Sequence, residues 1–151
     1  MAAAAVDSGV VASSHLLQCE SPAYTSGEIV VWAVGKNVFR YGTNTRRGKL
    51  VDEEHTEPVR AITHSNRGMW ATAGDDKQVI LWDEEFNTVL ARYTHRKKIT
   101  TAVFDHDGRL VIGDKYGEVW RLTPVEITGQ NGERRVEFAQ APPNSMEPEA
   151  Q

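Results

Sequence analysis

The stretch His55–Trp82, HTEPVRAITHSNRGMWATAGDDKQVILW, and the stretch His95–Leu122, HRKKITTAVFDHDGRLVIGDKYGEVWRL, share one pattern. Their histidines lie 40 positions apart, and the same offset aligns Gly68 with Gly108. The register holds over both stretches without a gap. A repeat of about 40 residues indicates a protein that stacks copies of one structural unit, and four short strands fill a unit of that length.

Each copy predicts short strands separated by tight turns. In the first copy, Met69–Ala73 alternates large and small side chains and Val79–Trp82 is a short apolar run, which are both typical of strands. Gly74–Lys77 between them indicates a turn, and the strand Val59–Thr63 precedes the hairpin turn Asn66–Gly68. The second copy repeats this order as Thr100–Phe104, His106–Gly108, Arg109–Ile112, Asp114–Gly117 and Glu118–Leu122.

A more divergent copy precedes these two. Glu28–Val34 predicts a strand, Gly35–Asn37 a turn and Val38–Tyr41 the returning strand. Trp32 stands 38 positions before Trp70, close to the same spacing. No segment has helical periodicity, so the sequence predicts an all-β chain of three units.

Composition limits the class of protein. The chain has 151 residues, of which 40% are hydrophobic and 25% charged, as in ordinary globular proteins. The formal net charge of -4 gives no general indication of nucleic-acid binding, so such a role would depend on a local patch or a partner. The single cysteine, Cys19, excludes an internal disulfide and fits the cytosol or the nucleus. No apolar run approaches the roughly 18 residues that cross a membrane.

The ends of the chain differ from its middle. Residues 1–12 lack the basic and apolar segments of a signal peptide, and we expect a disordered N-terminus there. Residues 13–125 hold the three units. Residues 126–151 are polar, contain proline and end with acidic residues, which predicts a disordered tail. A short amphipathic segment at 134–138 is the alternative.

The stretch Gly74–Asp83, GDDKQVILWD, resembles the end of a blade in the WD-repeat family, with its terminal Trp-Asp. The resemblance implies a partial β-propeller of about three four-stranded blades out of an expected seven. It also implies one hydrogen-bonded chain of side chains, at the positions His55, Thr72, Asp76 and Trp82. A buried Trp N–H or His without partners costs about 1–3 kcal/mol, so we interpret this set as structural rather than catalytic.

The next copy departs from that pattern. His95 is kept, but Tyr116 stands at the Asp position and Leu122 at the Trp position. We therefore expect packing alone to hold this copy.

A narrower resemblance covers Val31–Leu122. Its features are Ala33–Gly35 before a short Val-Phe-Arg strand, Ala73–Lys77, and above all Gly113–Trp120, GDKYGEVW. These segments resemble the non-catalytic WD-repeat subunit of the eukaryotic tRNA (guanine-N7)-methyltransferase. The resemblance implies a scaffold without catalytic residues or cofactor, in a heterodimer with a catalytic subunit. That partner binds S-adenosylmethionine, and the scaffold stabilises it and helps to seat tRNA, in the nucleus or also in the cytoplasm.

Part of the family's contacts with the catalytic subunit lies in later blades, which have no counterpart in the 151 residues. Two alternatives therefore stay open. One is a general WD-repeat adaptor that binds proteins, and the other is a truncated form without function.

Basic residues in the loops are candidate contacts for RNA or a partner. We expect Arg46–Lys49 to lie in one loop between units and Arg96–Lys98 in the next, so that both loops share one face. Phosphates need only positive charge, although solvated loop charge is the alternative. Lys115 either contacts the catalytic subunit or RNA, or caps its turn. The candidate basic residues are Arg46, Arg47, Lys49, Arg96, Lys97, Lys98 and Lys115.

Other polar groupings are better explained as turns than as chemistry. Asp105–Asp107 with His95 has the residue types of a metal site, but DHDG is an ordinary hairpin turn, and no metal is expected. Asp75 and Asp76 belong to a repeated turn, without a setting that raises a carboxyl pKa. His64 lies near Ser65 and Asp75, but no Gly-x-Ser-x-Gly elbow is present, so the sequence predicts no enzyme.

Overall fold

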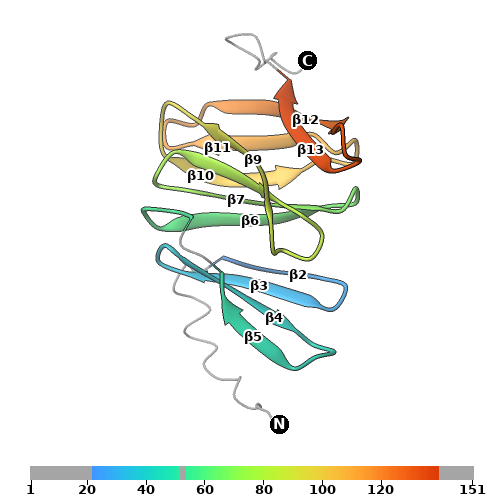
Figure 1. Cartoon of the computed structure of the whole chain (residues 1–151). Helices are drawn as coiled ribbons and strands as arrows, with labels where there is room; N and C mark the ends of the chain where they lie inside the picture. The colour runs from blue at the N-terminus through green and yellow to red at the C-terminus, as the bar shows by residue number, and fades with distance from the viewer. Residues whose placement is uncertain (1–21, 52–53, 140–151) are drawn as a thin grey trace.

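The computed structural model describes residues 22–51 and 54–139, which form three four-stranded antiparallel sheets stacked one on the next (Figure 1). The first sheet contains β2 (Ala23–Ser26), β3 (Ile29–Val34), β4 (Asn37–Gly42) and β5 (Arg47–Leu50). The middle sheet contains β6 (Val59–Ser65), β7 (Met69–Gly74), β8 (Gln78–Trp82) and β9 (Val89–Thr94). The third sheet contains β10 (Ile99–Phe104), β11 (Leu110–Asp114), β12 (Val119–Thr128) and β13 (Arg134–Ala139). The expected all-β fold of three four-stranded units is confirmed.

The strands of each sheet follow one another in chain order, joined by hairpins. Gly68 and Gly108, which the 40-residue offset aligns, have φ angles of 76° and 81° at the first hairpin of the middle and third sheets. A left-handed backbone is costly for residues with a Cβ, which explains glycine at both positions. No helix among the described residues could span a membrane.

The middle sheet forms a core with both neighbours because its side chains alternate between two faces. Trp70, Ile80 and Trp82 pack with Val31 and Val38 of the first sheet. The opposite face packs against the third sheet through small and aliphatic side chains, including Ala71, Val79, Leu81, Leu110, Ile112 and Leu122. All six residues of β7 are buried, so its period-2 pattern has an apolar partner on each side.

The two outer sheets each leave one face with exposed apolar side chains. On the first sheet Val34 is 56% exposed and Leu50 48%. On the third sheet Val103 is 54% and Val119 43% exposed. The 40-residue offset aligns Val119 with Val79, which is fully buried between the middle and third sheets. The outward face of the third sheet therefore repeats a face that elsewhere packs against another sheet.

The expected boundary at residue 126 is wrong, because the third sheet continues to Ala139. β12 extends to Thr128 and pairs with β13 from Arg134 to Ala139. Val136 is 4% exposed, and the Phe138 ring lies 5.8 Å from that of Tyr93. An outer strand needs only every second side chain to be apolar, so RRVEFA forms a strand despite its polar composition. Residues 1–12 and 140–151, also expected to be disordered, lie outside the described residues.

Candidate functional site

A buried network links the loop that precedes the middle sheet to the sheet itself. His55 Nδ1 lies 2.9 Å from Asp76 Oδ2, and His55 Nε2 lies 2.7 Å from Thr72 Oγ1. Trp82 Nε1–H donates to the same Thr72 oxygen over 3.0 Å. The His55, Thr72 and Trp82 side chains are buried, so every polar atom of the network has its partner inside the protein.

The chemistry of the partners fixes the tautomer of His55. A carboxylate only accepts, so Nδ1 carries the proton and donates it to Asp76. Burial lowers the pKa of His55 below the usual value of 6.5, against the opposing attraction of Asp76. The neutral ring then accepts the Thr72 hydroxyl proton at Nε2. The side chains of this network therefore hydrogen-bond to one another inside the middle sheet.

The third sheet holds its histidine by a different route. His95 Nε2 lies 3.2 Å from Asp114 Oδ2, and Nδ1 lies 3.3 Å from the Tyr93 hydroxyl. Asp114 also accepts hydrogen bonds from the backbone amides of Tyr116 and Glu118. Burial opposes ionisation of Asp114, but these hydrogen bonds outweigh it and lower its pKa below the usual range. The expectation that packing alone holds this sheet is therefore wrong, because the carboxylate enters two positions earlier, at the end of β11.

Equivalent backbone contacts bring the loop before each sheet against that sheet's second turn. The Asp75 amide donates to the Pro58 carbonyl over 2.9 Å, and the Lys115 amide donates to the Lys98 carbonyl over 3.0 Å. A Cβ on Gly74 would lie 2.2 Å from the Pro58 oxygen, so this approach requires glycine. Both loops and both turns consequently lie on the same side of the stack, at one set of strand ends.

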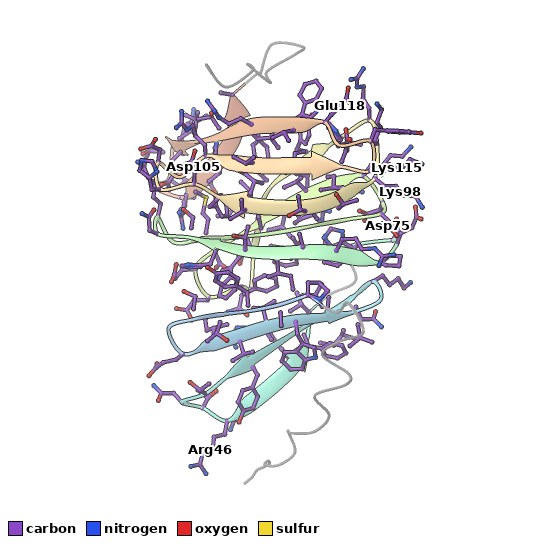
Figure 2. The ribbon with its side chains drawn as sticks, turned by 180° about the vertical axis from the view of Figure 1, so that it is seen from behind. Arg46, Asp75, Lys98, Asp105, Lys115 and Glu118 are labelled. Carbon is purple, nitrogen blue, oxygen red and sulfur yellow. The ribbon has the colours of Figure 1, made fainter. Side chains whose placement is uncertain are left out.

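Figure 2 shows Lys98 and Lys115 on that side of the stack, which we call the basic end. Two more of the predicted basic residues, Arg96 and Lys97, belong to it through their contacts with aromatic rings of the third sheet. Lys97 Nζ lies 4.3 Å from the centroid of the Tyr116 ring, and Lys115 Nζ lies 5.0 Å from it. Arg96 lies over the Trp120 ring at 5.4 Å. The basic end thus combines cations with aromatic rings.

The remaining basic candidates lie elsewhere. Figure 2 shows Arg46 on the first sheet, on the opposite side of the stack from Lys98 and Lys115. Arg47 and Lys49 lie in β5, the outer strand of the first sheet, and not in a loop between units. The expectation that Arg46–Lys49 and Arg96–Lys98 share one basic face is therefore wrong. Residues 47–50 form the fourth strand of the first sheet and do not form a loop between two sheets.

The predicted acidic turns bind arginines. Asp75 accepts two hydrogen bonds from Arg60, at 2.9 and 3.1 Å, and this pairing lowers the Asp75 pKa. Asp105 and Asp107 both bind Arg109 across their hairpin turn. Among the described residues no group of three or more His, Cys, Asp or Glu could hold a metal ion. The turn interpretation of these residues accounts for each contact.

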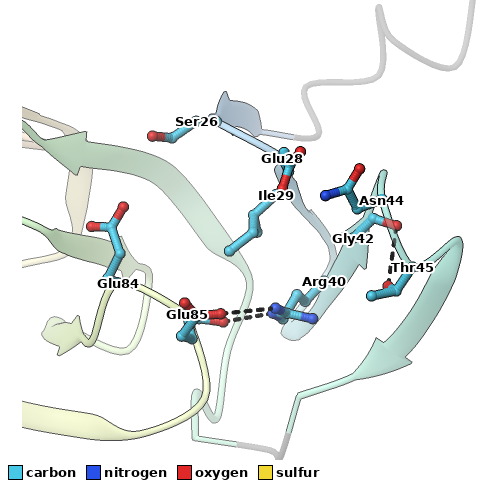
Figure 3. Close-up of a pocket in the computed structure, with 10 residues that line it drawn as sticks. Ser26, Glu28, Ile29, Arg40, Gly42, Asn44, Thr45, Glu84 and Glu85 are labelled. Carbon is cyan, nitrogen blue, oxygen red and sulfur yellow. Dashed lines mark hydrogen bonds and ion pairs between the residues drawn. The ribbon is translucent and has the colours of Figure 1, made fainter.

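The structure also shows a polar cleft between the first and middle sheets that sequence reasoning missed (Figure 3). Its volume is about 320 Å³, and Arg40 in its wall donates to the Glu85 carbonyl. Ser26 Oγ lies 3.0 Å from His64 Nδ1, and Glu84 Oε2 lies 3.1 Å from His64 Nε2. These residues come from different elements, and no local spacing in the sequence indicates their contact. The hydrogen-bonded chain joins the two sheets.

Comparison with known proteins agrees with this architecture. Residues 48–83 match the model of the WD domain, G-beta repeat. None of the curated proteins matches the chain. Similar solved structures are the β-propeller domain of Cps50 (Swd1) from Myceliophteria thermophila, with 13% identity and a TM-score of 0.55, and Hsv2 from Kluyveromyces lactis, with 14% and 0.57. The WD40 β-propeller domain of Doa1 gives 18% identity and a TM-score of 0.55.

These matches show the fold. They cover 83%, 68% and 62% of this chain for Swd1, Hsv2 and Doa1, but only 43%, 36% and 32% of the solved chains. The chain therefore spans less than half the length of these three structures. The WD40 propeller fold is typical of non-catalytic scaffolds that bind other proteins. Residues 48–83 thus match the WD40 repeat model, and the described chain has the fold of a partial, all-β propeller of the WD40 type.

Proposed function

We propose that the chain is a non-catalytic scaffold subunit of a tRNA (guanine-N7)-methyltransferase, which stabilises the catalytic subunit and helps to seat tRNA. The catalytic subunit binds S-adenosylmethionine in this proposal, and the present chain takes no cofactor. The nucleus is the proposed compartment, with the cytoplasm as the alternative.

The observation that carries the proposal is the position of Gly113–Trp120, the segment with the specific resemblance. Its acidic residue Asp114 is 3% exposed and bound to His95, whereas the next two residues, Lys115 and Tyr116, are exposed at the basic end. The buried contact fixes the turn, and a fixed turn presents its exposed side chains to a partner with little loss of conformational entropy.

The test is reconstitution with the separately purified catalytic subunit. We expect the full chain to raise methyl transfer to tRNA and to increase the melting temperature of the catalytic subunit. A control is Trp82→Ala, which destabilises the middle sheet and should reduce both effects. Unchanged N7-methylguanosine in tRNA after deletion of the gene, together with no effect in reconstitution, would contradict the proposal.

A second candidate is a WD-repeat adaptor for other protein complexes. The observation that favours it is the exposed apolar side chains on the outer sheets, since contiguous apolar surface marks protein interaction sites. This candidate predicts that a protein binds the outer face of the first or third sheet, and that Val103→Glu or Leu50→Glu abolishes this binding. Methyl transfer to tRNA should then be insensitive to the chain.

A further inference from the structure

We propose that the basic end binds single-stranded RNA, with Tyr116 as a stacking platform for a base and the neighbouring lysines and arginine as ligands of the phosphates. The binding surface consists of Arg96, Lys97, Lys115, Tyr116 and Trp120, and we call it the Tyr116 surface. The inference deepens the proposed function, on which its choice of RNA rests, because it assigns the RNA contact to named residues.

The first argument is the exposure of Tyr116. Its relative exposure is 65%, the highest of the large hydrophobic residues in the described chain. The aligned position in the middle sheet is Asp76, whose side chain is 2% exposed and bound to His55. In the third sheet Asp114 serves the histidine instead, so position 116 is released from the network. The shifted carboxylate explains how an aromatic side chain comes to project from this turn.

The second argument is that cations lie next to the exposed Tyr116 ring and the half-buried Trp120 ring. The Lys97 and Lys115 ammonium groups lie 4.3 and 5.0 Å from the Tyr116 centroid. Arg96 lies 5.4 Å from the Trp120 centroid. Trp120 is half-buried and also contacts His95, with ring centroids 5.4 Å apart. A flexible lysine can leave the ring for a phosphate, which makes the face of the ring available to a base.

The third argument is the charge at this surface. Lys97 pairs with Glu118 over 3.1 Å, and both side chains are partly exposed. In the described part of the chain, Arg96 and Lys115 form no ion pair with a carboxylate. Exposed pairs contribute about 0–1 kcal/mol, so a polyanion competes with Glu118 at little cost. The surface therefore has available positive charge although the whole chain is acidic.

The combination of rings and charges favours single-stranded RNA over an acidic peptide. A single strand supplies one phosphate and one unstacked base in each nucleotide, which matches cations placed next to aromatic rings. An acidic peptide would use the cations but has no flat group for Tyr116. Duplex RNA keeps its bases stacked and would bind more weakly than the single strand.

The test measures the fluorescence anisotropy of a fluorescein-labelled 12-nucleotide oligouridine with the purified full chain. Tyr116→Ala should weaken binding about fivefold or more, because stacking on an aromatic side chain contributes about 1–3 kcal/mol per base. Tyr116→Phe keeps the ring and should retain binding. Lys115→Gln should lower the slope of log K against log salt by about 0.7, as expected for one lost contact to a single strand.

The control is Arg46→Gln, which removes one positive charge on the side of the stack opposite to the basic end and should leave binding unchanged. Thermal melting checks that each variant remains folded, since Lys115, Tyr116 and Arg46 are all exposed. The proposal is overturned if Tyr116→Ala binds as tightly as the unmodified chain, if Arg46→Gln weakens binding as much, or if a 12-residue oligoaspartate competes as well as unlabelled oligouridine.

The outcome separates this inference from the proposed function. If oligouridine binding depends on Tyr116 but reconstitution shows no methyltransferase effect, the surface stands and the proposed function fails. If the chain activates the methyltransferase and Tyr116→Ala leaves oligouridine binding unchanged, the proposed function stands and this inference fails.

Discussion

The middle and third sheets have the same order of strands and the same 40-residue register, but they satisfy their buried histidines differently. The middle sheet uses Thr72, Asp76 and Trp82 around His55. The third sheet replaces all three partners, since Ile112, Tyr116 and Leu122 stand at the aligned positions, and His95 binds Asp114 and Tyr93.

This difference shows which part of the pattern the fold requires. Both histidines bind a carboxylate, although it comes from the turn in one sheet and from the end of a strand in the other. The threonine and tryptophan can be exchanged for aliphatic residues, because an apolar pair leaves no polar group without a partner. The feature that these two sheets share is a buried histidine with a carboxylate acceptor, and the register of the acceptor differs between them.

The largest predicted effect tests how far the middle sheet depends on its tryptophan. Trp82 is 2% exposed and stacks on Phe86 with centroids 4.5 Å apart. We expect Trp82→Ala to lower the free energy of unfolding by about 3–5 kcal/mol, measured by urea denaturation. Trp82→Leu, which copies the third sheet, should recover part of the loss. A loss below about 1 kcal/mol for Trp82→Ala would contradict the importance assigned to this ring.

The next prediction concerns the carboxylate of the third sheet. Asp114→Ala removes the partner of His95 and the acceptor of two backbone amides. We expect it to cost about 2–3 kcal/mol in the free energy of unfolding, since hydrogen bonds to charged groups each contribute about 1.5–3 kcal/mol. Asp107→Ala is the control, because it removes an exposed carboxylate and should change stability by about 0.5 kcal/mol or less. Equal losses in the two variants would show that packing alone holds the sheet.

A smaller effect is expected from pH, and it separates the two networks. The folded pKa of His55 is below its usual value of 6.5, so the unfolded chain takes up the proton first. The contribution of the neutral His55 ring to the free energy of unfolding is therefore fully present above pH 6.5 and decreases as the pH falls below this value. The Asp114 contribution is present above the usual aspartate pKa of 3.8 and is lost only at lower pH.

The measurement is thermal melting between pH 7.5 and 4.5. His55→Gln should flatten the dependence in this range, and Asp114→Asn should leave it unchanged. An unchanged slope in His55→Gln would refute the assignment of this acid sensitivity to the middle sheet.

The smallest predicted effect compares the second turns of the two sheets. Lys77 has a φ of 69°, whereas the aligned Gly117 has a φ of 84°. A residue with a Cβ is strained there by about 1–2 kcal/mol, and glycine loses about 0.5–1 kcal/mol to its greater freedom when unfolded. Lys77→Gly should therefore stabilise the chain by roughly 0.5–1 kcal/mol, and Gly117→Lys should destabilise it by a similar amount. Changes of the same sign in both variants would contradict this account.

The sequence predicted the regular parts of the molecule because they depend on local periodicity. The repeat register, the strands around Trp70 and Trp82 and the glycine turns all follow from spacing within one unit. Two of the three fourth strands, β5 and β13, were missed for the opposite reason. β5 and β13 consist of RGKL and RRVEFA, and their pairing partners rather than their composition make them strands.

The candidate site shows the same division between local and nonlocal information. The contacts around His55 were expected from the resemblance of this stretch to a blade of the WD-repeat family. The pairing of Asp114 with His95 could not be expected in this way. Asp114 stands two positions before Tyr116, the residue aligned with Asp76, and its contact with His95 is seen only in the folded structure. The contacts of His64 with Ser26 and Glu84 join residues 38 and 20 positions apart, and no repeat relates them.

The exposed outer faces also define a direction for any self-association. The outward face of the first sheet carries Trp32 and Phe39, whereas that of the third sheet carries Val103 and Val119. These surfaces differ, so a contact between them would be heterologous and could not be a two-fold symmetric dimer. Copies joined in this way would form either a closed ring or a polar filament with two unlike ends. Charge on one face alone, as in Val103→Glu, would be sufficient to prevent both.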